Sequence, residues 1–419
     1  MATTRRLSPP NIVLGLLCVM YLITYVDRVN ISTAADAIQR ELGLSNTRLG
    51  FLQSAFGYPY LLFQVFGGWV GDRFGPRRTL FLCGLVWATA TILTGFSVGL
   101  MMLFACRVLV GIGEGATFPV ATRAMQNWTP IGRRGFAQGL THSFARLGNA
   151  ITPPVVAWLI ITISWRGSFI VLGCCSLIWV LVWLWYFRDV PADHDGMTTA
   201  DLAPLPNQGA AAAVVRPRVP WGALTRRMAP VTIVYFCYGW TLWLYLTWLP
   251  QYFLHSYHLD LKRSALFTSA VFFAGVVGDY LGGVISDRVL HRTRNLQTAR
   301  RNVVMIGFIG SFVCMIPVFL TRDLTLIILS LGGAFFFAEI VIGPMWSIPM
   351  DIAGKFSGTA AGMMNTGSAL AAILSPIAFG YIIDRTGNWQ LPFAGSLGFL
   401  LLGALLAPTM HPERAFEEA

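Results

Sequence analysis

Long apolar stretches, each about the length of one membrane crossing, follow one another along almost the whole chain. A helix that spans a bilayer needs about 20 mostly apolar residues, whereas a strand of a membrane barrel needs about 10 residues that alternate in polarity. The first stretch is too long for a cleaved signal peptide and has no small-residue cleavage site after it, so we expect it to be retained. The pattern predicts about twelve spanning helices, near residues 11–34, 49–71, 79–97, 100–125, 136–162, 168–187, 229–253, 265–286, 302–320, 324–349, 357–383 and 391–409.

One long polar segment divides these stretches into two groups of six. Residues 188–228 contain several prolines and aspartates, a run of alanines and then a group of arginines. This composition is typical of a solvated, flexible linker. We therefore predict an all-α integral membrane fold with two six-helix bundles, at residues 1–187 and 229–419, and a cytoplasmic linker at residues 188–228.

The composition supports this interpretation. Only 12% of the 419 residues are charged and 55% are hydrophobic, whereas a soluble globular chain carries about 25% charged residues. A soluble enzyme, a disordered interaction protein and a disulfide-rich scaffold are all disfavoured. The seven cysteines are scattered through apolar runs without the spacing of metal ligands, so we expect them to be small buried apolar side chains.

Basic residues gather on one side of the predicted bilayer. A formal net charge of +11 could by itself suggest a nucleic-acid partner. However, about 20 of the 30 lysines and arginines fall on the side that holds both termini and the linker, and this kind of asymmetry orients membrane proteins. We predict cytoplasmic termini, a location in the inner (plasma) membrane, the lipid bilayer as a partner and no nucleic acid.

The two halves of the sequence repeat one another. Gly-Trp-Val-Gly-Asp-Arg at residues 68–73 follows the second predicted span, and Gly-Val-Ile-Ser-Asp-Arg at residues 283–288 follows the eighth. A second echo joins Phe118-Pro119, after the fourth span, to Gly343-Pro344, after the tenth. Two echoes in register indicate a duplicated six-span unit, with a site between the two bundles near mid-depth of the membrane.

Four ionisable residues lie inside the first and fourth predicted spans. Asp27 and Arg28 are adjacent, so their side chains point about 100° apart on a helix. Arg107 and Glu114 are seven residues apart and share one helix face. Because charges inside a bilayer are costly, such residues are functional by default. Protonation of either acid would release an arginine for another partner; the alternative is a static buried ion network.

The loop between the second and third predicted spans carries a recognisable pattern. Residues 68–78 resemble the signature loop of the major facilitator superfamily, Gly-x-x-x-Asp-Arg-x-Gly-Arg-Arg, except that Pro76 precedes the basic pair. The aspartate can lie near the positive N-terminus of a neighbouring helix, and the arginines can hold helix ends together. We expect a gating latch, the alternative being basic residues that only anchor the topology, and its members are Gly68, Asp72, Arg73, Gly75, Arg77 and Arg78.

The whole chain resembles one branch of that superfamily, the anion:cation symporters, which include bacterial transporters of galactonate, glucarate and hexuronates. The resemblance rests on Tyr25-x-Asp27-Arg28-x-Asn30, Arg107-x-x-x-Gly111-x-x-Glu114 with Phe118-Pro119, Trp243-x-x-x-Thr247-Trp248-x-Pro250, Trp346-Ser347 and Asn365. It implies that Arg28 meets the substrate anion. It also implies that Asp27 and Glu114 take protons and that Arg107 links the two carboxylates. The residues implied to line the cavity are Tyr25, Tyr60, Trp346, Ser347 and Asn365.

The fifth span departs from the sugar-acid pattern. His142, Arg146 and Asn149 lie on one helical face. Where the resemblance to the sugar-acid carriers implies an amide ligand, this span has Ala145 beside Arg146. Arg146 as a second substrate-binding arginine in the cavity would favour a dicarboxylate or a more strongly anionic substrate. Alternatively, Arg146 pairs with another acid inside the membrane, either Glu339 or Asp279.

These observations predict a transporter and not an enzyme. The preferred hypothesis is import of a small organic anion, a sugar acid or related carboxylate, by alternating access, with protons as the coupling ion and no other cofactor. The alternative is an exchanger or facilitator of dicarboxylates or aromatic carboxylates without proton coupling. The six histidines lack metal-ligand spacing, and the sequence has no phosphate-binding Gly-x-x-x-x-Gly-Lys-Ser/Thr loop. We expect a monomer.

Overall fold

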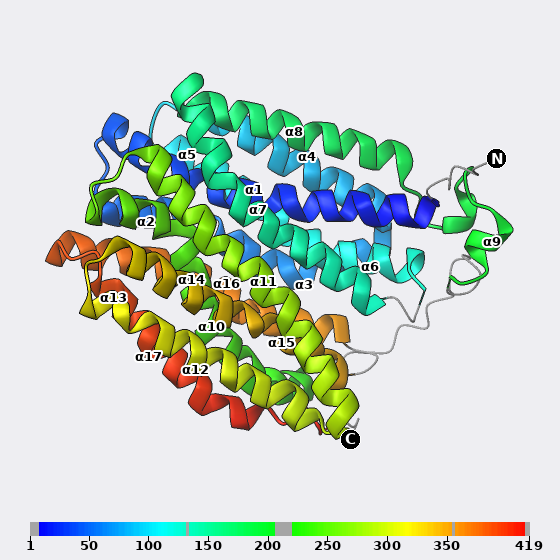
Figure 1. Cartoon of the computed structure of the whole chain (residues 1–419). Helices are drawn as coiled ribbons and strands as arrows, with labels where there is room; N and C mark the ends of the chain where they lie inside the picture. The colour runs from blue at the N-terminus through cyan, green and yellow to red at the C-terminus, as the bar shows by residue number, and fades with distance from the viewer. Residues whose placement is uncertain (1–7, 131–133, 206–219, 354–356, 415–419) are drawn as a thin grey trace, which may run out of the picture.

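The computed structural model describes residues 8–130, 134–205, 220–353 and 357–414, and within these residues it is helical throughout (Figure 1). The predicted spans of the first group correspond to helices whose bounds are α1 (Pro9–Leu42), α2 (Asn46–Ser54) with α3 (Gly57–Phe74), α4 (Pro76–Thr94), α5 (Leu100–Gly115) with α6 (Thr117–Trp128), α7 (Arg134–Thr162) and α8 (Trp165–Tyr186). Together these helices are called the N-half.

The second group forms the C-half. Its helices are α10 (Trp221–Ser256), α11 (Leu261–Thr293), a π-helical turn η4 (Gln297–Asn302) with α12 (Val303–Met315) and α13 (Pro317–Leu320), α14 (Leu324–Ile340) with α15 (Ile342–Ala353), α16 (Ser357–Thr386), and α17 (Leu391–Leu406) with the 3₁₀ turn η6 (Ala407–Met410). Between the halves lie a short 3₁₀ turn, η2 (Pro191–Asp193), and one helical turn, α9 (Thr199–Leu202).

The outer surface of the bundle is apolar. Within the described residues, ten helical stretches are long and apolar enough to cross a membrane. Large apolar side chains are widely exposed on them, among them Trp158 at 62%, Trp185 at 73% and Leu405 at 67%. A helix that is apolar on all sides is either buried or surrounded by lipid, so this surface is suited to contact with lipid.

Each half packs mainly within itself, and a few helices join the halves. In the N-half, α1 packs on α7 and α4 packs on α8; in the C-half, α10 packs on α16 and α11 packs on α14. Contacts between the halves are made chiefly by α7 with α11, by α2 and α3 with α16, and by α1 with α10. The cavity described below lies between the helices of these contacts.

The halves meet tightly at one face of the bundle. The face at which α1 begins and η6 ends is called the terminal face, and the other is called the opposite face (Figure 1). At the opposite face the Asp384 carboxylate of α16 accepts hydrogen bonds from Asn46 and Thr47 of α2. A Cβ added to Gly50 would lie 2.4 Å from the carbonyl oxygen of Pro376. Because glycine permits this close backbone approach, the halves are packed together at this face.

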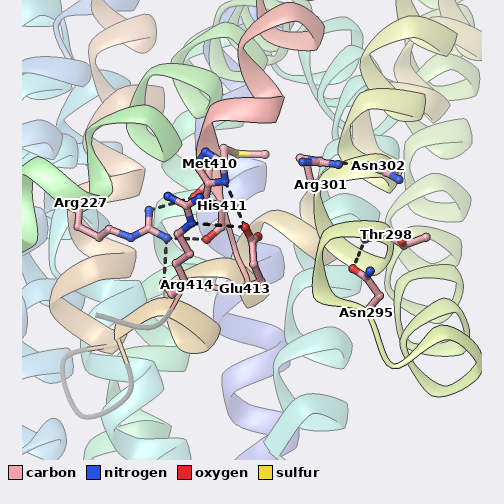
Figure 2. Close-up of polar contacts among 9 residues, drawn as sticks. All are labelled: Arg227, Asn295, Thr298, Arg301, Asn302, Met410, His411, Glu413 and Arg414. Carbon is pink, nitrogen blue, oxygen red and sulfur yellow. Dashed lines mark hydrogen bonds and ion pairs between the residues drawn. The ribbon is translucent and has the colours of Figure 1, made fainter. Parts of the chain in front are cut away.

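The helix α10 begins within the segment that we predicted to be a linker. Residues 221–228 form the first two turns of α10, because a helix continues through polar residues once it leaves the membrane. The Arg227 side chain of this extension donates hydrogen bonds to the carbonyl oxygens of Met410, His411 and Arg414, at 3.0, 2.6 and 2.9 Å (Figure 2). It therefore satisfies carbonyls after α17 that have no partner within a helix.

Candidate functional site

A cavity lies between the two halves. It encloses about 480 Å³ of space between atoms, its open side included. Both halves line it, with Tyr25, Arg28, Tyr60, Phe118, His142 and Arg146 from the N-half, and Tyr235, Leu242, Trp243, Leu246, Trp346, Asn365 and Ser368 from the C-half.

Most of the residues predicted to bind substrate line this cavity, and Ser347 is the exception. Tyr25, Arg28, Tyr60, Arg146, Trp346 and Asn365 are all at its wall. The Ser347 hydroxyl instead donates a hydrogen bond of 3.0 Å to the Gly343 carbonyl, one turn earlier in α15. A serine within a helix can bond back to its own backbone in this way, and motif position alone does not reveal it.

Arg28 is held by one carboxylate and surrounded by aromatic rings. Its Nε donates a 2.7 Å hydrogen bond to Oε2 of Glu114, and both side chains are buried. The guanidinium carbon lies 4.6 Å from the Tyr25 ring centre, 4.8 Å from that of Tyr60 and 5.1 Å from that of Phe118. Such faces attract a cation. Nη2 of Arg28 has no hydrogen-bond partner among the described residues, so one arm of the guanidinium can still bind an anion.

Asp27 and Arg107 lie close to this pair but outside it. Asp27 is buried, with Oδ2 3.2 Å from the Ser176 hydroxyl and Oδ1 unpartnered within the described part of the chain. Arg107 is also buried and interacts electrostatically with both acids. However, no ion pair within 4.0 Å joins Arg107 to either acid. The resemblance implied that Arg107 links the carboxylates, whereas in this structure Arg28 is the arginine bonded to Glu114.

Arg146 makes the second intramembrane ion pair, and this pair crosses between the halves. Its Nε lies 2.7 Å from Oε2 of Glu339 in α14 and 3.6 Å from Oδ2 of Asp279 in α11. The N–H is not directed at the glutamate oxygen, so the contact is a close ion pair without a hydrogen bond. The Tyr238 hydroxyl donates a 3.0 Å hydrogen bond to Oε1 of Glu339. Both sequence interpretations of Arg146 therefore describe part of its position: it lines the cavity, and it pairs with acids of the C-half.

Several polar side chains of the site were not predicted. Ser176 contacts Asp27, Tyr238 contacts Glu339, and the Tyr235 hydroxyl accepts a 3.0 Å hydrogen bond from Nε1 of Trp346. A single hydroxyl in an apolar span gives no periodic signal, so only the fold brings these residues to the charges. No group of three His, Cys, Asp or Glu side chains suited to a metal ion is found in the described ranges.

The predicted gating loop is described only in part. The surroundings of Gly68 and the side chains of Asp72 and Arg73 lie outside what the structure describes, so the gating role of these residues stays a prediction. Arg77 donates hydrogen bonds of 3.1 and 2.8 Å to the Leu184 carbonyl of α8, and this contact lies within the N-half.

A half-buried carboxyl organises the start of α4 beside this loop. Asp189 accepts a 2.8 Å hydrogen bond from the Arg77 backbone N–H. Burial raises the pKa of the Asp189 carboxyl, against the opposing effects of that N–H and of the charges on Arg77 and Arg78. Gly75 has φ of +84°, a value that glycine adopts readily, and it passes directly beside the Asp189 carboxyl.

Both the sequence and the fold of this chain are similar to those of known transporters. The family model described as Major Facilitator Superfamily matches residues 17–376. A Cupriavidus necator protein named "Probable sulfoacetate transporter" is 48% identical, with 97% of this chain and 95% of the relative covered. A D-galactonate transporter of Escherichia coli is 31% identical, with 94% and 93% covered. The crystal structure of a bacterial homologue of the human lysosomal transporter Spinster, inward-facing and unoccupied, matches with a TM-score of 0.77 at 16% identity, over 99% of this chain and 100% of that one.

Proposed function

The chain belongs to the major facilitator superfamily, and we propose that it imports a small organic anion together with protons. Its relatives in this family are named transporters of organic anions, so the chain is a multi-pass membrane transporter and not an enzyme. The proposal adds three points: the direction of transport, the coupling to protons and the chemical class of the anion.

The ion pair between Arg28 and Glu114 carries this proposal. A substrate carboxylate or sulfonate would need the guanidinium that Glu114 now holds at 2.7 Å. Removal of one partner from a buried ion pair costs about 3–5 kcal/mol, because a charge is left uncompensated. A proton on Glu114 removes that cost as the anion takes its place on Arg28. Arrival of the anion and uptake of the proton are then linked.

Asp27 supports the proposal through its contact with Ser176. The Ser176 hydroxyl has one proton but lies near two oxygens, at 3.2 Å from Asp27 and at 3.1 Å from the Leu172 carbonyl. When the hydroxyl donates to the Leu172 carbonyl, it can bond to Asp27 only by accepting a hydrogen bond from a protonated carboxyl. When Asp27 is ionised, the hydroxyl can turn and donate to it. The Ser176 hydroxyl can therefore form a hydrogen bond with Asp27 in both its protonated and its ionised form, as a residue that carries a proton requires.

The relatives narrow the class of anion. A relative that is 48% identical is named for sulfoacetate, and relatives near 30% identity are named for galactonate, galactarate or glucarate. All of these compounds are small acids with a carboxylate. We propose sulfoacetate as the first substrate to assay, with the sugar acids as comparators.

The orientation follows from the distribution of basic residues. We place the terminal face in the cytoplasm and the protein in the inner membrane, because arginines and lysines gather in the loops at that face. Since the halves are packed together at the opposite face, this orientation places the tightly packed face of the bundle on the outer side of the membrane.

Uptake into proteoliposomes with an imposed pH gradient tests this function. We expect a gradient that is alkaline inside to drive accumulation of sulfoacetate or a sugar acid, Arg28→Ala to abolish uptake, and Glu114→Gln to remove its dependence on the gradient. Arg263→Ala is the matched control, because its side chain is 70% exposed at the start of α11. If the wild type equilibrates these anions but never responds to the gradient, the protein is a facilitator or exchanger and the proposal of symport is wrong.

A further inference from the structure

We propose that Arg146 and Glu339 form a second site for anion and proton exchange, so that the transported substrate is a short dianion. Arg28 would hold one acid group and Arg146 the other. Glu339 would take up a proton as it gives up Arg146. This inference rests on the proposed function, since it concerns the same cavity and the same transport cycle.

The two arginines lie within reach of one small molecule. The guanidinium carbons of Arg28 and Arg146 lie 4.6 and 5.3 Å from the centre of the same Tyr25 ring, so they are at most about 10 Å apart. A bound carboxylate or sulfonate places its central atom about 4 Å from a guanidinium carbon. The two acid groups of a two-carbon acid are separated by two bonds, or about 2.5–3 Å. A dianion of that length can therefore reach both arginines, and a sulfonate-carboxylate is one such molecule.

The charges around Arg146 do not balance. One guanidinium faces two carboxylates, Glu339 at 2.7 Å and Asp279 at 3.6 Å, and all three side chains are buried. An uncompensated charge in such a place costs several kcal/mol, so one of the two carboxyl groups carries a proton when the cavity is empty. If a substrate anion then occupies Arg146, the second carboxylate loses its counter-charge and must also be neutralised.

Glu339 is the acid placed to take that second proton. The titratable groups that face it are Arg146 from α7, Asp279 from α11, and Tyr238 and Tyr235 from α10. The Tyr238 hydroxyl donates to Oε1 and leaves Oε2 toward Arg146. When Arg146 turns to the substrate, Oε2 becomes the oxygen that is free to bind the proton.

Sulfoacetate and 2-hydroxyethanesulfonate make a matched pair of probes. They have the same sulfonate and a similar size, but the second has an uncharged CH2OH group in place of the carboxylate. In proteoliposomes we expect the wild type to prefer sulfoacetate in kcat/KM by about 10- to 100-fold, the range for loss of one charge-assisted hydrogen bond. Arg146→Ala should bring the ratio close to one while pH-driven uptake of 2-hydroxyethanesulfonate continues.

The Glu339→Gln variant tests whether Glu339 takes up a proton during transport. The variant should move one positive charge fewer with each sulfoacetate, so its accumulation should fall about tenfold relative to the wild type when a valinomycin potential of about 60 mV, negative inside, is applied. Arg146→Lys, which keeps the charge, guards against a folding defect in Arg146→Ala and should retain part of the preference. Arg263→Ala should behave as the wild type.

The possible failures are distinguishable. If the wild type transports neither these probes nor a sugar acid in response to a pH gradient, the proposed function fails. If it transports a sugar acid in this way but neither probe, only the second exchange site is wrong. If pH-driven transport is normal but Arg146→Ala reduces uptake of both probes equally, or Glu339→Gln leaves the charge per sulfoacetate unchanged, the second exchange site is wrong and the first site stands.

Discussion

Replacement of Asp384 by alanine should open the bundle at the opposite face. The Asp384 carboxylate, in the C-half, accepts hydrogen bonds from the backbone N–H groups of Asn46 and Thr47 at 3.1 and 2.6 Å. It also accepts bonds from the side chains of the same two residues. It thus caps the first turn of α2, in the N-half, from across the boundary between the halves. Conformations that separate the halves at this face lack these bonds.

The size of the effect follows from the capping contact. An aspartate that satisfies the first amides of a helix is worth about 0.5–2 kcal/mol. Four bonds at an exposed position support a value of about 1–2 kcal/mol, which changes the ratio of two conformations by about 5- to 30-fold. The Asp384→Ala population should therefore shift toward conformations that are open at the opposite face.

Hydrogen–deuterium exchange, measured by mass spectrometry in nanodiscs, can detect this shift. We expect faster exchange in Asp384→Ala over both residues 42–57 and residues 376–390, because the two segments separate together. Asp260→Ala is the matched control. Asp260 also caps a helix, α11, through a 2.7 Å bond from the Arg263 backbone N–H, but within its own half. If Asp384→Ala speeds exchange only in the first turn of α2, as the loss of a helix cap alone would, the Asp384 contact does not hold the two halves together.

Three further predictions concern the turn between α3 and α4, all read by thermal unfolding of the purified protein. Arg77→Ala removes both hydrogen bonds to the Leu184 carbonyl and should lower the free energy of unfolding by about 1–3 kcal/mol. Arg78→Ala, which changes an exposed neighbour, should unfold at the same temperature as the wild type. Equal unfolding temperatures for the two variants would contradict this stabilising role of Arg77. Gly75→Ala places a Cβ at φ of +84°, 2.6 Å from the Asp189 carboxyl, and this strain should lower the free energy of unfolding by about 1–3 kcal/mol. An unchanged midpoint of thermal unfolding would show that the substitution causes no such strain. Folding raises the pKa of Asp189, so the stability that its carboxyl contributes is present below the unfolded pKa near 4 and is lost as the pH rises through the folded value. Asp189→Asn should therefore gain stability relative to the wild type as the pH rises above about 4, and a constant difference would rule this out.

The helical architecture could be predicted because lipid leaves few alternatives. In a bilayer every backbone polar group must be satisfied within the spanning segment, so a long apolar stretch can hardly be anything but a helix. All twelve predicted stretches are helical within the described residues. The bounds were less predictable, since polar residues outside the membrane carry no such constraint, and α10 begins at Trp221 for that reason.

The charged residues of the site could be identified, but their pairing could not. The spacing of Arg107 and Glu114 shows that they share a helix face, yet the arginine bonded to Glu114 is Arg28, on another helix. Long side chains reach several neighbours, and the packing of whole helices selects among them. In the same way, both Glu339 and Asp279 were available to Arg146, and the fold places both acids beside it.

The two ion pairs of the cavity have different mechanical consequences. Arg28 and Glu114 both belong to the N-half, so exchange of the glutamate for a substrate anion needs no movement between the halves. Arg146 lies on α7 and its partner Glu339 lies on α14. Exchange of Glu339 for a substrate anion therefore breaks an ion pair that joins the halves near the centre of the bundle. A substrate with one acid group satisfies Arg28 and leaves that bond in place. A dianion replaces it and, with Glu339 neutralised, removes the attraction that resists separation. Under the proposed mechanism, binding of the second acid group to Arg146 therefore both selects the dianion and frees the halves to separate.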